Sequence, residues 1–256
     1  MRLKRILITI TLLLHSTVLY LQAQIRSNID DTTVNAKLLT FSYSVQVPVA
    51  DLAERFGTSN CLGGGLYFKI PHNILLGAEA NYIFGGNIRE DSILNFLYTS
   101  SGGLIGIDGL YETVFLFERG IAFWGKFGKI IPVFNSNPNT GITLIAGAGF
   151  LQHRIKFSSP NHTLPYLSGD YLKGYDRLSN GFAVSQYIGY THLDKRKLMN
   201  FTFGVEVIEA FTKSRRDWNM DQMKKDESKR FDMLLGIKVG WILPFYGRGE
   251  ERIYTY

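Results

Sequence analysis

Four charged residues, Glu79, Lys126, Glu206 and Lys238, each lie in a segment where apolar and polar residues alternate, and each is on the polar face. Alternate side chains of a β-strand point to opposite faces, so these charges would point away from the apolar face. Two acids and two bases on one enclosed surface are expected to pair, because a buried unpaired charge is costly. We interpret them as a static ionic plug; the alternative is an ion path gated by exchange of partners.

The alternation is clearest in residues 39–47, where one face is apolar or aromatic and the other is polar and small. Similar alternation occurs in residues 62–70, 76–84, 110–118, 121–133, 142–156, 182–193, 199–211 and 232–243. Most of these segments are 9–13 residues long. A tilted membrane strand needs about 9–11 residues, whereas soluble strands average about 5–6 residues. The pattern therefore predicts an all-β fold, a closed antiparallel transmembrane β-barrel.

Nine alternating segments conflict with the even strand count of bacterial single-chain barrels. Short connections are predicted at 71–73, 118–120 and 194–197, and long ones at 51–60, 85–109, 135–141 and 213–230. A turn at 158–162 followed by a weak strand at 163–171 restores the alternation of short and long connections. Ten strands are therefore favoured, and eight remain possible.

Residues 89–97 have helical rather than alternating spacing of apolar residues. This spacing predicts a short amphipathic helix at the barrel mouth. A packed loop helix is the favoured interpretation, and a gate is the alternative.

The first residues predict export. Arg2, Lys4 and Arg5 precede an apolar run over residues 6–14, and small and polar residues follow, with cleavage expected after Ala23. A membrane anchor is the less favoured alternative, because polar residues interrupt the run before it reaches the roughly 20 residues of a span. The predicted organisation is a signal peptide, 1–23, and one outer-membrane barrel domain, 24–256.

Composition agrees with a barrel and argues against nucleic acid as a partner. The chain is 45% hydrophobic and 14% aromatic, with 26 glycines, which is typical when only alternate residues face lipid. Three of the net +6 charges lie in the signal segment, and the remaining +3 is too weak to indicate nucleic acid. No cofactor is predicted.

The long connection 213–230 is rich in basic residues. Its candidate surface residues are Lys213, Arg215, Arg216, Lys224 and Lys225. We interpret it as a solvated loop beside anionic lipopolysaccharide, because basic residues gain favourable electrostatics near anionic head groups. A partner-docking loop is the alternative.

Catalytic chemistry is not predicted. His153 has Ser158 and Ser159 beyond it, but a catalytic triad needs a positioned third group. No pair of histidines has the spacing of metal ligands.

Three stretches carry a resemblance to known outer-membrane proteins. The chain ends in Arg-Ile-Tyr-Thr-Tyr, at 252–256, which resembles the C-terminal aromatic signal read by the outer-membrane barrel assembly machinery. Residues 236–245 and the glycine and aromatic pattern of 141–150 resemble small outer-membrane barrels of the Bacteroidota type. The resemblance implies a multi-pass barrel in the outer membrane of a Gram-negative bacterium. Such families include pores, adhesins, lipid-modifying enzymes and secretion-system subunits.

We therefore predict an outer-membrane barrel with a structural or interaction role in the cell envelope. A narrow pore for small solutes or ions is the alternative, and a lipid-modifying enzyme is third. The expected partners are outer-membrane lipid and lipopolysaccharide, the assembly machinery, and an envelope protein.

Overall fold

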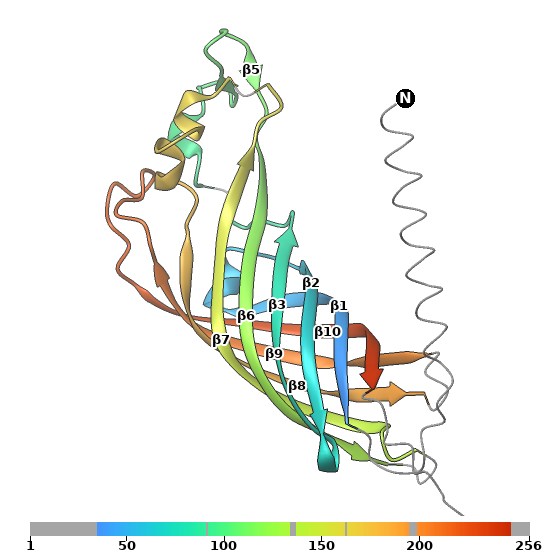
Figure 1. Cartoon of the computed structure of the whole chain (residues 1–256). Coiled ribbons are helices and arrows are strands. Elements are labelled where there is room, and N and C mark those ends of the chain that lie inside the picture. The colour runs from blue at the N-terminus through green and yellow to red at the C-terminus, as the bar shows by residue number, and fades with distance from the viewer. Residues whose placement is uncertain (1–34, 91, 134–136, 162, 195–198, 247–256) are drawn as a thin grey trace, which may run out of the picture.

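The chain folds into a closed antiparallel barrel. The computed structural model describes residues 35–90, 92–133, 137–161, 163–194 and 199–246. Eight strands close in the order β1-β10-β9-β8-β7-β6-β3-β2 (Figure 1). Their bounds are β1 Ala36–Ala50, β2 Ser59–Ile70, β3 Ile74–Gly85, β6 Phe115–Pro132, β7 Gly141–Ser158, β8 Ser179–Leu193, β9 Asn200–Ser214 and β10 Lys229–Tyr246. Because β1 pairs with both β2 and β10, the ring has no open edge.

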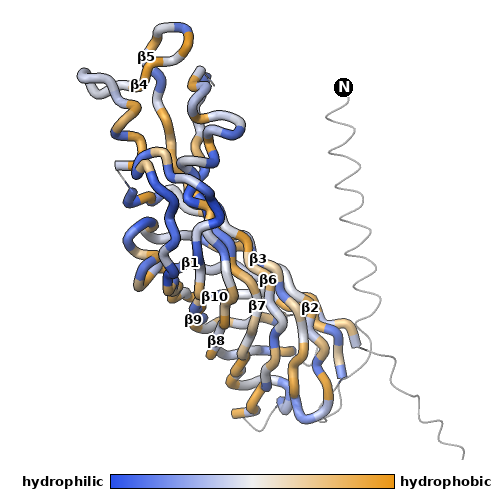
Figure 2. Tube along the Cα trace, turned by 90° about the vertical axis from the view of Figure 1, so that its left-hand side faces the viewer, coloured by the Kyte–Doolittle hydropathy of each residue, from blue (hydrophilic) through white to orange (hydrophobic). Residues whose placement is uncertain are grey.

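The period-two sequence explains the two surfaces of the wall. On β1, Phe41 and Val45 are exposed, whereas the polar Ser44 and Gln46 are buried. All the barrel strands present apolar side chains outward. Their hydropathy changes repeatedly between apolar and polar along each strand (Figure 2). We call this exposed set the apolar belt, which includes Phe41, Leu66, Leu76, Phe123, Phe127, Phe150, Ile188, Phe203, Ile237 and Trp241.

Among the described residues, no helix has the length and apolar character needed to cross a membrane.

The two ends of the barrel differ. One end, the turn end, holds η2 Pro71–Asn73, residues 133 and 137–140 between β6 and β7, residues 194 and 199 between β8 and β9, and the paired residues Ala36 and Tyr246 of the first and last strands. Consecutive left-handed residues, His72 and Asn73 with φ of 63° and 60°, reverse the chain between β2 and β3.

The other end, the loop end, holds the connections 51–58, 86–114, 159–178 and 215–228. Within these loops lie η1 Asp51–Glu54, η3 Asn95–Leu97, η4 Pro165–Leu167 and η5 Tyr171–Gly174, and a small separate sheet of β4 Leu104–Ile105 and β5 Tyr111–Glu112. Short turns at one end and long loops at the other match the pattern of outer-membrane barrels.

The fold class is confirmed with eight strands, and the favoured count of ten is wrong. The predicted turn at 118–120 lies inside the continuous strand β6, where Gly120 pairs with both Ile83 and His153. A side chain on Gly120 would come within 2.8 Å of the Gln152 carbonyl oxygen. This glycine therefore permits close approach of neighbouring strands and does not make a turn.

The predicted weak strand at 163–171 is also absent. That segment contains η4, and Pro165 lacks the N–H that a central strand must donate. Gly169 has φ of 54°, which breaks an extended backbone. Because the predicted strands 110–118 and 163–171 do not form separate barrel strands, the described residues 137–141 of the predicted long connection 135–141 lie at the turn end and not among the long loops.

The predicted helix at 89–97 is not an α-helix in its described residues, 89–90 and 92–97. Residues 89–90 are irregular, residues 92–94 form a turn, and residues 95–97 form the three-residue η3. Ile93 and Leu94 are buried, whereas Phe96 is 80% exposed. The apolar spacing that resembles a helix therefore reflects a loop that buries two adjacent side chains. The predicted signal, 1–23, and the C-terminal aromatic ending at Tyr256 lie outside the described residues.

Candidate functional site

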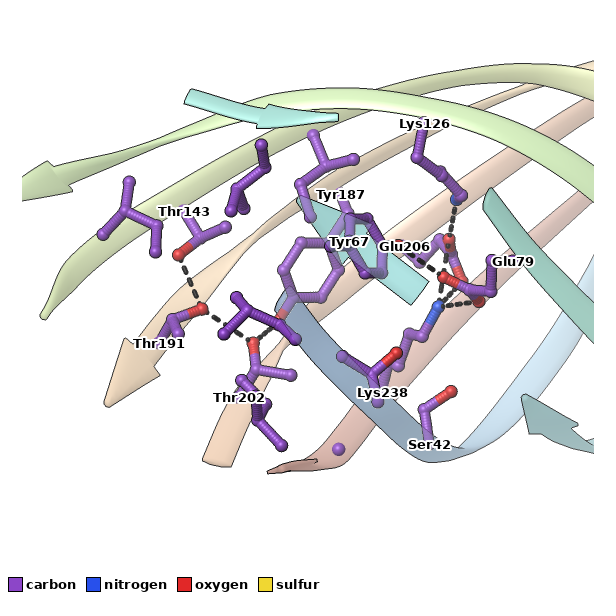
Figure 3. A pocket seen from close by; sticks show the side chains of 17 residues that line it. Ser42, Tyr67, Glu79, Lys126, Thr143, Tyr187, Thr191, Thr202, Glu206 and Lys238 are labelled. Carbon is purple, nitrogen blue, oxygen red and sulfur yellow. Dashed lines mark hydrogen bonds and ion pairs between the residues drawn. The ribbon is translucent and has the colours of Figure 1, made fainter. Parts of the chain in front are cut away.

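The four predicted lumen charges meet inside the barrel, as their pattern indicates. They come from β3, β6, β9 and β10 (Figure 3). Lys126 Nζ lies 2.7 Å from Glu206 Oε1, and Lys238 Nζ lies 2.5 Å from Glu79 Oε1. Lys238 Nζ also lies 3.2 Å from Glu206 Oε2. We call these four residues the lumen cluster, and Glu206 is the carboxylate that joins its two ion pairs.

Neutral side chains complete the lumen cluster. The Tyr67 hydroxyl donates to Glu79 Oε2 at 2.8 Å, and Lys126 Nζ donates to Ser185 Oγ at 2.6 Å. Lys126 Nζ also lies 5.0 Å from the centroid of a Trp124 ring, a distance at which a cation is attracted to the ring face. Each charge therefore has at least one partner, and the cluster as a whole is neutral.

Two glycines on the inner face leave the space that the charges occupy. A Cβ on Gly147 would come within 2.7 Å of the Lys126 Cδ and 2.5 Å of the Ser185 Oγ. A Cβ on Gly63 would come within 3.3 Å of Glu79 Oε1. In a barrel of about eight strands, side chains almost fill the interior, so glycines are needed where long charged side chains meet.

A small cavity of about 50 Å³ adjoins the lumen cluster on its turn-end side. Hydroxyls of four residues run along it as a chain (Figure 3). Tyr187 Oη lies 2.6 Å from Thr202 Oγ1, Thr191 Oγ1 donates to Thr202 Oγ1 at 3.2 Å, and Thr143 Oγ1 donates to Thr191 Oγ1 at 2.7 Å. The rest of the cavity wall is mostly apolar, so the hydroxyl chain and the charges of the lumen cluster form its polar side.

Apolar layers close the lumen on both sides of the cluster. The layer toward the turn end comprises Ala36, Leu38, Tyr67, Leu75, Ile130, Leu193 and Ile242. The layer toward the loop end includes Cys61, Ile83, Ala122, Trp124, Leu151, Ala183, Ile208, Ala210 and Leu234. Two further side chains of that layer, Leu52 and Phe56, come from the loop after β1, and Phe56 is fully buried. The charged groups are therefore sealed between two apolar layers.

A second polar group, which the sequence pattern did not reveal, lies nearer the loop end. His153 Nε2 lies 2.9 Å from Asp232 Oδ2, and the Thr212 hydroxyl donates to the same oxygen at 2.5 Å. All three residues are buried, and the Phe56 ring lies edge-on to His153, with 5.5 Å between centroids. The pair was missed because His153 and Asp232 are 79 residues apart, although both have the inward position in their strands.

Ser159, one of the two serines beyond His153 in the sequence, does not bond to that histidine. Ser159 donates instead to Glu112 Oε1 at 2.6 Å. Within the described part of the chain, no three His, Cys, Asp or Glu side chains gather as a metal site would require.

Hydrogen bonds to Glu112 join two of the loops. Its carboxylate also accepts from the Asn161 backbone N–H at 2.9 Å and from the Thr163 hydroxyl at 2.6 Å. Hydrogen bonds from Ser159, Thr163 and Asn161 lower the pKa of Glu112 to about 2. The carboxylate thus fixes the loop 159–178 against β5.

Ion pairs join all four connections at the loop end. Arg177 lies 2.9 Å from Glu90 and 2.5 Å from Asp221, and Arg55 lies 3.2 Å from Glu90. Arg55 also lies 3.9 Å from Asp226. Because the five residues come from the connections 51–58, 86–114, 159–178 and 215–228, we call them the loop clasp. The clasp therefore ties the four connections to one another at this end of the barrel.

Two of the predicted basic residues are held in ion pairs. Arg216 binds Asp176 through two hydrogen bonds, one of them 2.7 Å long. These bonds raise the pKa of Arg216 above its ordinary value. Lys225 lies 3.1 Å from Glu227 on the surface.

The other three, Lys213, Arg215 and Lys224, are exposed. Arg215 donates to Asn180 Oδ1 at 2.5 Å. The predicted basic loop is therefore not one cluster, since its members divide between internal ion pairs and the outer surface.

Comparison with known proteins finds likeness of fold alone. No family model matches the chain, and no curated protein matches its sequence. The chain is similar to the solved structure of Ail, the attachment invasion locus protein of Yersinia pestis, with 8% identity, 82% of this chain and 99% of that chain covered, and a TM-score of 0.45. It is similar to Neisserial surface protein A with 8% identity, coverage of 82% and 97%, and a TM-score of 0.42. For the outer membrane protein OprG of Pseudomonas aeruginosa, the identity is 8%, the coverage 84% and 98%, and the TM-score 0.35.

Proposed function

We propose that this protein is an integral barrel of the outer membrane, of the small Bacteroidota type, with a non-enzymatic structural or interaction role in the cell envelope. The sealed lumen is the observation that carries this proposal. Lys126 and Glu206 each have side chains only 1% exposed, and apolar layers lie on both sides of them. A barrel whose interior is filled offers its outer wall and its loops for contact with partners.

The apolar belt supports the membrane location. Leu66, Leu76 and Ile237 are all more than 40% exposed on the barrel wall, whereas the polar Gln46, Thr143 and Ser185 are buried inside it. Soluble proteins rarely expose apolar patches larger than a few hundred Å². In a bilayer, the same distribution is favourable, because the outward residues contact hydrocarbon.

Export and insertion are part of the proposal. The segment 1–23 would direct export and be cleaved after Ala23, and the C-terminal aromatic would contact the barrel assembly machinery. Lipopolysaccharide and an envelope protein are the proposed partners.

Two measurements on the expressed protein test this location. We expect the protein in the outer-membrane fraction of a Gram-negative host, and we expect the folded form to migrate faster than the boiled form in a denaturing gel. Recovery as a soluble protein without detergent, with no change of migration on boiling, would refute the membrane proposal.

A narrow pore is the second candidate, and the hydroxyl-lined cavity beside the lumen cluster favours it. Exchange of ion-pair partners would have to open a path through the apolar layers. Under this alternative, recordings from Glu79→Ala and Lys238→Ala variants in planar bilayers would show conductance steps. Silent recordings from both variants would count against a pore.

A further inference from the structure

Six basic side chains lie on the outer wall near the loop end. They are Arg119 on β6, Arg154 and Lys156 on β7, Lys213 on β9, Arg215 just after β9, and Lys229 on β10. We call them the outer collar. Arg119 and Arg154 are each four residues from a belt phenylalanine, Phe123 and Phe150, so they share its outward face.

Like charges lie directly opposite each other in the outer collar. Arg119 pairs with Arg154 across β6 and β7, and Lys213 pairs with Lys229 across β9 and β10. Directly opposite residues have Cβ atoms about 5 Å apart, and like charges there are destabilising. The strand register therefore brings cations together at a cost to the fold.

In the described part of the chain, no ion pair joins a collar cation to an acidic side chain. The side chains of Arg154 and Lys156 have no hydrogen-bond or ion-pair partner there. The Arg119 guanidinium donates to the Glu118 carbonyl oxygen at 2.6 Å and lies 5.1 Å from the Phe117 ring centroid. An anion from outside the chain would relieve the repulsion.

The collar has a definite place relative to the belt. A strand rises about 3.3 Å per residue, so Arg154 lies about 13 Å along β7 from Phe150. On the opposite wall, the outward residues near the loop end are uncharged, with Val47 on β1, Asn60 on β2 and Phe84 on β3. The collar is therefore one-sided and borders the apolar belt on the side of β6 to β10.

We propose that the part of the outer collar formed by Arg119, Arg154 and Lys156 binds the phosphate groups of an anionic outer-leaflet lipid. This inference rests on the proposed outer-membrane location. Two guanidinium groups suit a phosphate because each donates paired hydrogen bonds, and lysine adds a point charge. A lipid fits better than a soluble phosphate, because one molecule can place its acyl chains on Phe123 and Phe150 and its phosphate at the arginines.

Native mass spectrometry of the full chain in detergent tests this site. The probes are diphosphoryl lipid A, phosphatidylethanolamine and inorganic phosphate. The test variant is Arg119→Gln/Arg154→Gln/Lys156→Gln. The matched control, Lys37→Gln/Lys129→Gln/Lys173→Gln, removes three charges from exposed positions that lie off the collar and outside the basic loop 213–230. Heat-modifiable migration shows that each variant is folded.

We expect wild type and control to bind diphosphoryl lipid A about a hundredfold more tightly than the test variant, with weaker binding of phosphatidylethanolamine and no competition from millimolar phosphate. Equal binding by wild type and a folded test variant would overturn the site. So would an equal loss in the control, equal affinity for phosphatidylethanolamine, or displacement of the lipid by phosphate. A folded protein in the outer-membrane fraction with no difference between variants refutes the lipid site alone, whereas absence from that fraction refutes the proposed function.

Discussion

Replacing Glu206 by glutamine removes the carboxylate that both lumen lysines share. In wild type, its oxygens lie 2.7 Å from Lys126 Nζ and 3.2 Å from Lys238 Nζ, and the side chain is 1% exposed. After the replacement, Lys126 has no carboxylate partner and keeps the Ser185 hydroxyl, at 2.6 Å, and the Trp124 ring. The lumen then holds two lysines against Glu79 alone, so that one buried cation has no counter-charge.

Breaking a buried ion pair in this way costs about 3–5 kcal/mol. Glutamine keeps the volume of the side chain and can still accept a hydrogen bond, so we expect about 3 kcal/mol for Glu206→Gln. That loss corresponds to a change of more than a hundredfold in the folding equilibrium, since about 1.4 kcal/mol is tenfold. Removing the lysine as well, in Lys126→Met/Glu206→Gln, is expected to restore at least about half of the loss, because a neutral replacement leaves no unpaired charge.

Urea-dependent folding into lipid vesicles, followed by tryptophan fluorescence, measures both changes. Glu209→Gln is the matched control, because this carboxylate lies on the same strand and is not buried. We expect it to shift the free energy of unfolding by less than about 1 kcal/mol. Wild-type stability in Glu206→Gln, or a double variant less stable than the single one, would refute the assignment of the lumen cluster as a paired plug.

Three further predictions follow from the packing and the loops. Gly147→Ala should lower the free energy of unfolding by about 1–3 kcal/mol in the same assay, because its Cβ would come within 2.7 Å of the Lys126 Cδ. An unchanged free energy of unfolding would show that neighbouring side chains can move to make room for the methyl group. Phe56→Ala should cost about 3–5 kcal/mol, because the ring is fully buried in the loop-end apolar layer; a loss below about 1 kcal/mol would mean that this loop does not seal the mouth. Hydrogen bonds hold the pKa of Glu112 at about 2 against its ordinary 4.5. Its ionised carboxylate therefore stabilises the contact between the two loops above pH 4.5, and this stabilisation is lost as pH falls toward 2. Hydrogen exchange of residues 104–112, corrected for intrinsic rates, should therefore speed up over that interval in wild type and not in Glu112→Gln, and an equal pH response in both would exclude Glu112 as the cause.

Most strand positions and the lumen charges could be predicted from one local rule, that alternate side chains of a strand point to opposite faces. Along β3, Leu75, Glu79 and Ile83 are all buried, and period-two spacing alone assigns them to one face. The energetic cost of a lipid-facing lysine then decides which face is inward. The four charges meet because strands of one small barrel share one lumen.

The strand count and the second polar group could not be predicted in this way. Gly120 has the residue type of a turn, and only the neighbouring strands reveal that it is needed for close approach. The contact of His153 with Asp232 depends on the register of β7 and β10, which are not neighbours in the ring. Register depends on pairing across the whole barrel. The sequence of one strand therefore does not determine which residues of a distant strand it meets.

Single-channel recording from the wild-type protein in a planar bilayer tests the sealed lumen most directly. The chain should be inserted in folded form, as judged by heat-modifiable migration, beside an open porin that reports insertion and sensitivity. The ion-paired lumen cluster between two apolar layers predicts no conductance steps at moderate voltage. Reproducible steps from the folded wild-type protein would contradict the sealed barrel and would favour the narrow pore.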